Sequence, residues 1–280
     1  MSNYKSSKGN LPIRYDITSL YIFSLITAIL TAATSGLGLA YSSTIYPTED
    51  LFHTFVPNDI VNLIIGLPIL VGSIWAAWRD KLIGILLWPG ALFFLLYNYL
   101  VYLFSMPFNE IWLLYLTLVT INLYTLIALI ACIDGPVVKK QLSGNVSERL
   151  AGGVLSGLGL LFMIQVISTS VSTIAAQVPI SKSEVALHMA DFIIAPAWII
   201  GGVLLWRRST FGYLTGLGLL FQGSMLFVAL ISFLVLQPIL TDMPFVLIDI
   251  LTIIIMGMVC FIPFAVYLRG VISYQESDPQ

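Results

Sequence analysis

Long apolar segments alternate with short polar ones along the whole chain. Because a helix needs roughly 20 predominantly apolar residues to cross a bilayer, each long segment predicts one membrane-spanning helix. The first segment exceeds the apolar region of a secretory signal peptide, which favours a retained helix over a cleaved one. The sixth is short, and its helix could begin near Val185. Eight segments qualify: 17–41, 60–78, 82–104, 111–133, 150–176, 191–206, 211–236 and 245–268.

The amino-acid composition is that of a membrane protein. Of the 280 residues, 59% are hydrophobic and only 9% are charged, whereas soluble domains carry about 25% charged residues. The two cysteines, Cys132 and Cys260, lie in apolar segments and are interpreted as small core residues rather than as a disulfide framework. No basic patch with interleaved aromatic residues occurs, which argues against a nucleic-acid partner. We therefore expect an all-α, polytopic integral membrane protein whose main partner is the lipid bilayer.

The charged residues are divided between the two sides of this arrangement. Eleven Lys and Arg residues fall on one side, and only Lys182 falls on the other. Since cytoplasmic loops carry the excess of Lys and Arg, the chain is predicted to lie in the cell (cytoplasmic) membrane with both termini inside. The eleven are Lys5, Lys8, Arg14, Arg79, Lys81, Lys139, Lys140, Arg149, Arg207, Arg208 and Arg269. The outward side is acidic and carries Glu49, Asp50, Asp59, Glu110, Glu184, Asp191, Asp242 and Asp249.

The chain matches itself when it is shifted by 128 positions. Eight identities fall within residues 68–93, where roughly two or three are expected for such a biased composition. A second match, at a shift of 121, relates the segment SGLGL at 35–39 to the same segment at 156–160. The identical pairs at the larger shift are Pro68 with Pro196, Trp78 with Trp206, Arg79 with Arg207, Gly84 with Gly212, Leu86 with Leu214, Gly90 with Gly218, Leu92 with Leu220 and Phe93 with Phe221.

These matches predict an internal duplication. The first four-helix membrane repeat comprises residues 1–134, a cytoplasmic linker 135–149, the second repeat 150–272, and a polar tail 273–280. Because each repeat has an even number of spans, both copies keep one orientation, and a pseudo-two-fold axis along the membrane normal should relate them. The alternative is chance matching between apolar segments of similar composition.

The two histidines of the chain occur in similar surroundings. Each follows a glutamate by four positions and precedes an aspartate, at Glu49, His53 and Asp59 and again at Glu184, His188 and Asp191. On a helix, residues four apart share a face, so a carboxylate and an imidazole could hold one ion together. Nitrogen and oxygen ligands of this kind suit zinc or another first-row divalent metal. The pairing predicts a metal or small-ligand site at the outward end of the repeat interface.

Simpler interpretations exist for the same residues. Asp59 follows Pro57 and Asn58 at the expected start of a span, where an aspartate commonly caps a helix. Asp242 precedes the last span in the same way, and Asn109 with Glu110 precedes the fourth. The two histidines could be ordinary polar residues at the membrane interface.

Charged residues are scarce within the spans, which argues against an ion-pair pathway at the bilayer midplane. Pro68 and Pro196 predict matching kinks in the second and sixth spans. The run Tyr97-Asn98-Tyr99-x-x-Tyr102 is interpreted as an aromatic packing stripe, with ligand contact as the alternative. Asp249 could face either solvent or the bundle interior. Uncharged polar residues within the spans are Asn62, Asn98, Asn122, Gln165 and Gln222.

Three classes of function agree with these features. The first is a transporter or permease-like protein with an outward-facing cavity at the repeat interface. The second is a metal-dependent membrane enzyme in which a carboxylate activates a metal-bound water, although no common catalytic motif is present. The third is a non-catalytic structural or assembly protein in which the same residues are caps and loop contacts.

Overall fold

Eight helices long and apolar enough to cross a membrane make up most of the chain. The computed structural model describes residues 11–177 and 179–277 and contains no named β-strand there. The spanning helices are α1 (Thr18–Ala40), the rod Glu49–Trp78, α5 (Leu82–Ser105), α6 (Glu110–Cys132), α8 (Glu148–Ala176), α9 (Lys182–Trp206), α10 (Thr210–Leu240) and α11 (Leu247–Ser277). Short helices α2 (Ser42–Ile45) and α7 (Gly135–Leu142) lie between them. The predicted all-α class and the eight predicted spans are therefore confirmed at this level.

The second span begins earlier than predicted. It comprises α3 (Glu49–Val61), a π-helical turn η1 (Asn62–Gly66) and α4 (Leu67–Trp78) in one continuous rod. The Thr48 hydroxyl caps α3 by accepting a hydrogen bond from the Leu51 amide (3.4 Å), and two acids occupy the first turn. The prediction that Asp59 caps this span is wrong, because the helix starts ten residues before Asp59 and continues past it.

Capping residues also mark the starts of α6 and α9, the first as predicted and the second earlier than predicted. Asn109 caps α6 by accepting a hydrogen bond from the Trp112 amide at 3.0 Å. Ser181 caps α9 in the same way through the Glu184 amide at 3.1 Å, which places the start of the sixth span before Val185. An acid in the first turn follows each cap, where it complements the partial positive charge of the helix N-terminus.

The two matched prolines have different effects. Proline has no amide hydrogen and cannot donate to the carbonyl four residues earlier, and η1 ends two residues before Pro68. Pro196, in contrast, lies inside α9, which remains α-helical throughout. Only the first helix therefore changes its winding next to its proline, and the pair of matching kinks stays a prediction.

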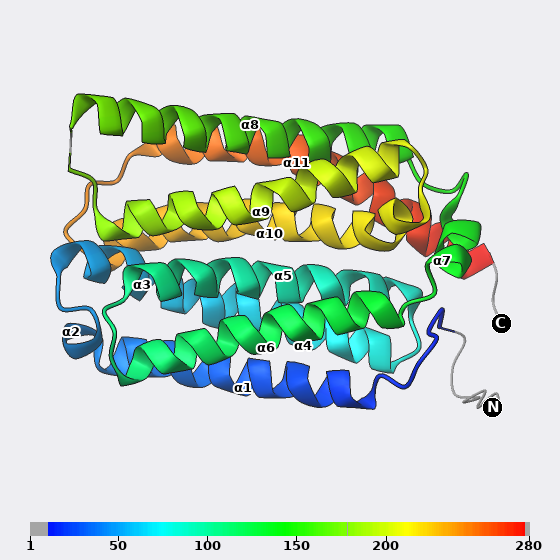
Figure 1. The fold of residues 1–280 in the computed structure, drawn as a ribbon, viewed down its shortest axis with the longest axis horizontal. Coiled ribbons are helices and arrows are strands. Elements are labelled where there is room, and N and C mark those ends of the chain that lie inside the picture. The colour runs from blue at the N-terminus through cyan, green and yellow to red at the C-terminus, as the bar shows by residue number, and fades with distance from the viewer. Residues whose placement is uncertain (1–10, 178, 278–280) are drawn as a thin grey trace.

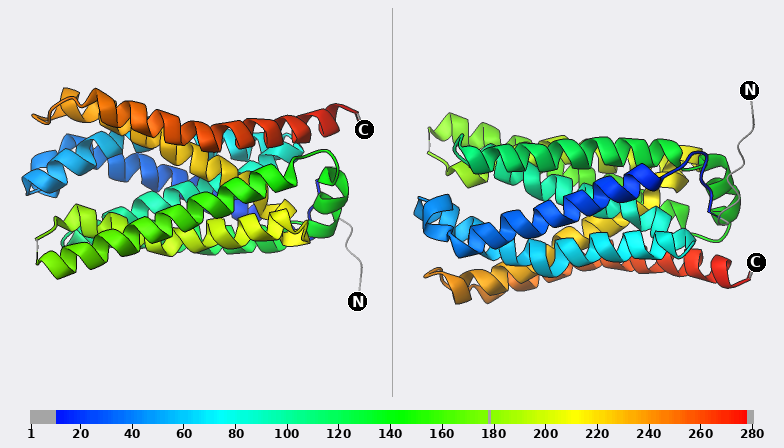
Figure 2. Two further views of the ribbon diagram at one scale, coloured as in Figure 1. Left: turned by 90° about the horizontal axis from the view of Figure 1, so that it is seen from above. Right: turned by 90° about the horizontal axis from the view of Figure 1, so that it is seen from below.

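The helices form one bundle with two visible halves. In Figure 1, α8 to α11 lie above the helices α1 to α6, and Figure 2 shows all the long helices running along the long axis of the molecule. Helix α5 is the most enclosed of the spans. Of the 18 residues in its apolar stretch, 78% are buried, against 22–39% in the other spans. It packs on α4 and α6 of its own half and on α9 and α10 of the other.

Two glycines allow α5 and α10 to approach each other closely. A Cβ atom at Gly90 would overlap the backbone carbonyl of Gly218, and a Cβ atom at Gly218 would lie 3.1 Å from the carbonyl oxygen of Leu86. Small residues at such crossings let helix backbones pack together in a bilayer, where lipid offers little hydrophobic driving force. Gly90 and Gly218 are also one of the pairs that match at a shift of 128.

The turns that lead into α5 and α10 have the same backbone geometry. Asp80 and Arg208, one in each turn, both adopt positive φ, at 56° and 55°. In the first turn the Asp80 amide donates to Ala77, and in the second the Arg208 amide donates to Leu205, each at the same offset. Both turns lie at the end of the bundle that carries α7 (Figure 1).

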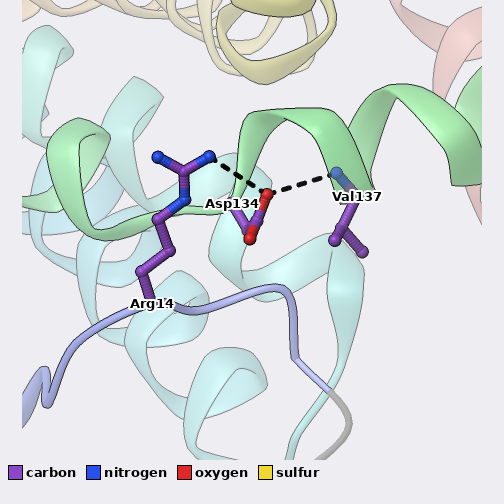
Figure 3. A network of polar contacts seen from close by, with 3 residues as sticks. All are labelled: Arg14, Asp134 and Val137. Carbon is purple, nitrogen blue, oxygen red and sulfur yellow. Dashed lines mark hydrogen bonds and ion pairs between the residues drawn. The ribbon is translucent and has the colours of Figure 1, made fainter. Parts of the chain in front are cut away.

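The segment before α1 is fastened to the junction of α6 and α7 (Figure 3). Ile13 forms a β-bridge with Ile133, and the Arg14 guanidinium lies 3.3 Å from the Asp134 carboxylate. Asp134 also caps α7 by accepting from the Val137 amide at 3.4 Å. The side-chain hydrogen bond from Arg14 holds the pKa of Asp134 below its usual value.

A buried acid fastens the start of α8 at the same end. Glu148, 5% exposed, accepts a hydrogen bond from the Tyr213 hydroxyl at 2.6 Å. Its other oxygen lies 3.6 Å from the Arg208 guanidinium. This carboxylate therefore has a positive partner and a clear structural role, because it joins α8 to the turn before α10.

Replacing Gly90 with alanine is expected to destabilise the bundle, because the new methyl group would overlap the backbone of α10. Overpacking of this kind costs about 1–3 kcal/mol. The measurement is thermal unfolding of the purified protein in detergent, where G90A should have the lower midpoint.

Gly72→Ala is the matched control, since no atom lies within 4 Å of a Cβ atom built at Gly72. Alanine favours a helix over glycine by about 1 kcal/mol, so G72A should keep or raise the midpoint. Equal midpoints for the two variants would contradict the close contact between α5 and α10.

Candidate functional site

The six residues predicted to share a metal site are distributed over several places. No three His, Cys, Asp or Glu side chains gather in a metal-binding arrangement within the described residues. Glu49 and Glu184 are exposed in the first turns of α3 and α9. The zinc hypothesis therefore gains no support from the geometry and stays a prediction. The six are Glu49, His53, Asp59, Glu184, His188 and Asp191.

The two histidines lie at different levels of their helices. The turns after α4 and α9 have the same geometry, so the position of each histidine can be counted from the tryptophan that precedes its turn. His53 precedes Trp78 by 25 residues, whereas His188 precedes Trp206 by 18. A difference of seven residues corresponds to about 10 Å along a helix axis. The backbone oxygen of His53 accepts from Gln237 on α10 at 3.2 Å, while His188 lines a hollow between α8 and α9.

Asp59 lies buried between helices of the first half. It is 1% exposed, and its two carboxylate oxygens accept hydrogen bonds from the Tyr46 hydroxyl at 2.6 Å and the Tyr102 hydroxyl at 2.8 Å. A Cβ atom at Gly38 would overlap the Asp59 carboxylate, so α1 lies directly against it. Burial, and then the charge of Asp59, raises the pKa of Tyr46, which keeps this phenol protonated as a donor.

Aromatic rings hold these donors in position. Phe55 packs on Tyr46 with ring centroids 5.7 Å apart and on Tyr102 at 4.5 Å. Tyr102 also packs on Tyr115 at 5.0 Å and accepts a hydrogen bond from Asn62 at 3.4 Å. Contacts of this kind fix the direction in which each hydroxyl points, which is how an outer layer of residues orients a polar site.

Asp191 lies in a different environment, in a cavity of about 170 Å³ between the two halves. It is partly exposed, and its carboxylate accepts a hydrogen bond from the Tyr97 hydroxyl at 2.9 Å. His188, one turn earlier on α9, interacts with it electrostatically. The other polar residues at the cavity wall are Thr54, Asn58 and Asn98, and the amide nitrogen of Asn98 is buried without a hydrogen-bond partner.

The rest of the cavity wall is largely aromatic and aliphatic. Trp198 donates its indole hydrogen to Gln222 at 2.5 Å and packs edge-on against Phe162 at 5.4 Å. Phe227 contacts Phe162 at 6.4 Å. These contacts hold the Trp198 ring in place as part of the wall. The apolar and aromatic lining residues are Tyr97, Val101, Phe162, Leu187, Ile194, Ala195, Trp198, Leu226, Phe227, Ala229, Leu230 and Phe233.

Residues 97–102 of α5 contact both carboxylates. Tyr97 holds Asp191, Tyr102 holds Asp59, and Asn98 lines the cavity. Tyr99, between them, lies 3.1 Å from the Thr34 hydroxyl of α1. The run was interpreted from sequence as a packing stripe, and its rings do pack, but its hydroxyls also make the polar contacts of both sites.

The starts of α3 and α9 are joined directly. The Ser183 hydroxyl donates to the Asp50 carboxylate at 2.5 Å, and the Ser183 amide lies 3.4 Å from the same group. Asp50 and Ser183 both lie in the first turn of their helices, so the hydrogen bond joins the N-terminal ends of α3 and α9, two helices that line the Asp191 cavity. Sequence reasoning had grouped Asp50 only with the acids of the outward side.

Comparison of this chain with protein families, with curated proteins and with solved structures found no match. The structure contains two candidate sites. One is a buried carboxylate inside the first half, and the other is a partly exposed carboxylate in an aromatic cavity between the halves.

Proposed function

We propose that this chain is a transporter or permease-like membrane protein that binds a small organic cation in the cavity between its halves. The observation that carries the proposal is the partly exposed Asp191 carboxylate in a cavity walled by Trp198, Phe162 and Phe227. Ligand sites are typically apolar hollows with a few convergent polar groups. A carboxylate supplies the counter-charge for an amine, and aromatic faces attract a cation.

The lining residues favour an organic ligand over a metal ion. Asp191 is the one Asp, Glu, His or Cys among the residues that line the cavity, whereas divalent metals are held by several such ligands. The unpartnered amide nitrogen of Asn98 can donate to an acceptor atom on the ligand. The ligand is thus a small amine with an apolar body.

We further propose that the two halves are the predicted duplication, residues 1–134 and 150–272. The matching turns at Asp80 and Arg208 favour this, as does the contact between Gly90 and Gly218, which would lie at the pseudo-two-fold axis. Two related halves around a central cavity are a common arrangement in transporters, in which one half moves against the other.

In the proposed orientation both termini lie on the cytoplasmic side of the cell membrane. The end of the bundle that carries α7 also carries the first described residues and the end of α11 (Figure 1). The basic residues Arg14, Arg79, Lys140 and Arg207 belong to segments at that end, as the positive-inside rule requires of a cytoplasmic face. Lys5 and Lys8 lie outside the described residues. In this orientation Asp191 lies in the outer part of the bundle.

The proposal is tested with 2-phenylethylamine as the cationic probe and 2-phenylethanol as its neutral counterpart. The amine should raise the thermal midpoint of the purified protein with increasing concentration, because a ligand that binds only the folded state stabilises it. Asp191→Asn should weaken this response at least tenfold, about 1.4 kcal/mol. Uptake of labelled amine by proteoliposomes then distinguishes transport from binding alone.

Asp249→Asn is the matched control, because it removes an exposed acid that does not line the cavity. D249N should respond to the amine as the unaltered protein does. Equal responses of D191N and the unaltered protein would refute the proposed site, and binding without uptake would refute the transport function.

A further inference from the structure

Asp59 is a second carboxylate, and the ligand cavity does not explain why it is buried. It does not line the Asp191 cavity and is buried between α1, α3 and α5 with two phenol donors. Its two oxygens can accept about four hydrogen bonds when ionised, and two are provided by Tyr46 and Tyr102. A charge buried in this way is costly unless a positive partner neutralises it.

The surrounding helices provide no such partner. The two ion pairs within the described residues are Arg14 with Asp134 and Arg208 with Glu148, and neither includes Asp59. The titratable groups that face Asp59 are phenols: Tyr46 before α3, Tyr99 and Tyr102 on α5, and Tyr115 on α6. Helix α1 contributes hydroxyl groups, and no cluster of metal-ligating side chains includes Asp59.

A buried serine hydroxyl group lies beside the carboxylate. Ser35, one turn before Gly38 on α1, is 1% exposed, and its oxygen makes no hydrogen bond within 3.5 Å although it faces Asp59. An ionised carboxylate could accept the Ser35 hydrogen, whereas a carboxylic acid could donate its own hydrogen to the Ser35 oxygen. The site therefore contains both the donors that an ionised carboxylate needs and an acceptor for its protonated form.

We propose that Asp59 is a proton-binding site, separate from the ligand cavity, that exchanges one proton with water. On protonation, an O–H bond forms at the Asp59 carboxylate, the hydronium ion that supplies the proton becomes water, and the new hydroxyl donates to Ser35. On release, the proton returns to water and the carboxylate is held by Tyr46 and Tyr102. The site stands independently of the proposed amine ligand.

Infrared difference spectroscopy between alkaline and mildly acidic pH tests the site on the full chain in lipid nanodiscs. Exposed carboxylates have pKa values of about 4 and stay ionised over this range, so a buried acid gives a distinct C=O stretching band. Because Asp191 is itself partly buried, the band is recorded in the Asp191→Asn variant, where it should persist, and adding Asp59→Asn should remove it. Absence of the band while Asp59 is present, or its persistence after Asp59→Asn, would overturn the proposal.

Two conservative variants keep the test decisive even if D59N fails to fold. Ser35→Ala removes a hydroxyl that can donate to the ionised carboxylate, so the pH at which the band forms should rise. Tyr102→Phe removes a donor to the carboxylate, so that pH should rise, each by on the order of one pH unit. A fall of that pH in either variant, or no shift in both, would contradict the assigned geometry.

Salt exchange separates a proton from a monovalent metal ion. Replacing sodium chloride with choline chloride should leave the pH of band formation unchanged, because a proton needs no competing ion. If added sodium lowers that pH, a metal ion occupies the site and the proton assignment is wrong. Failure of 2-phenylethylamine to bind would refute the amine cavity alone and would leave the infrared result unaffected.

Discussion

The close contact of α5 with α10 is the constraint on which the rest of the structure depends. Lipid tails are as apolar as the helices, so van der Waals contact between backbones contributes much of the helix association within a bilayer. Gly90 and Gly218 permit that contact, and it places α5 in the middle of the bundle. From there α5 reaches helices of both halves and can carry side chains to a site on each side.

The two carboxylates show how strongly environment determines chemistry. Asp59 and Asp191 each accept a hydrogen bond from a tyrosine of α5. Asp59 is sealed by rings and by Gly38 and exchanges with nothing larger than water or a proton. Asp191 adjoins a cavity with space for an organic ligand. The proposed amine site and proton site therefore use the same residue type and differ in the size and packing of the surrounding side chains.

The sequence predicted the class of fold well, because eight apolar segments and their caps are local features. It also selected Asp59 and Asp191 as candidate metal ligands, a role that stays a prediction, and offered Asp59 as a helix cap as well. That interpretation failed because a polar stretch after Thr48 forms helix once the cap and first-turn acids are in place. The contacts of Tyr97 and Tyr102 could not be predicted, since they depend on which helices α5 meets. The signal available was two phenols five residues apart within an apolar helix.

The five-residue spacing of Tyr97 and Tyr102 has a mechanical consequence. At 100° per residue their side chains project about 140° apart around α5, one toward each carboxylate. Both hydroxyls belong to one rigid helix, so a rotation of α5 that moves one donor relative to its carboxylate also moves the other. Thermodynamic linkage then requires reciprocity: whatever factor an occupant of the cavity imposes on the proton affinity of Asp59, the proton imposes on that occupant.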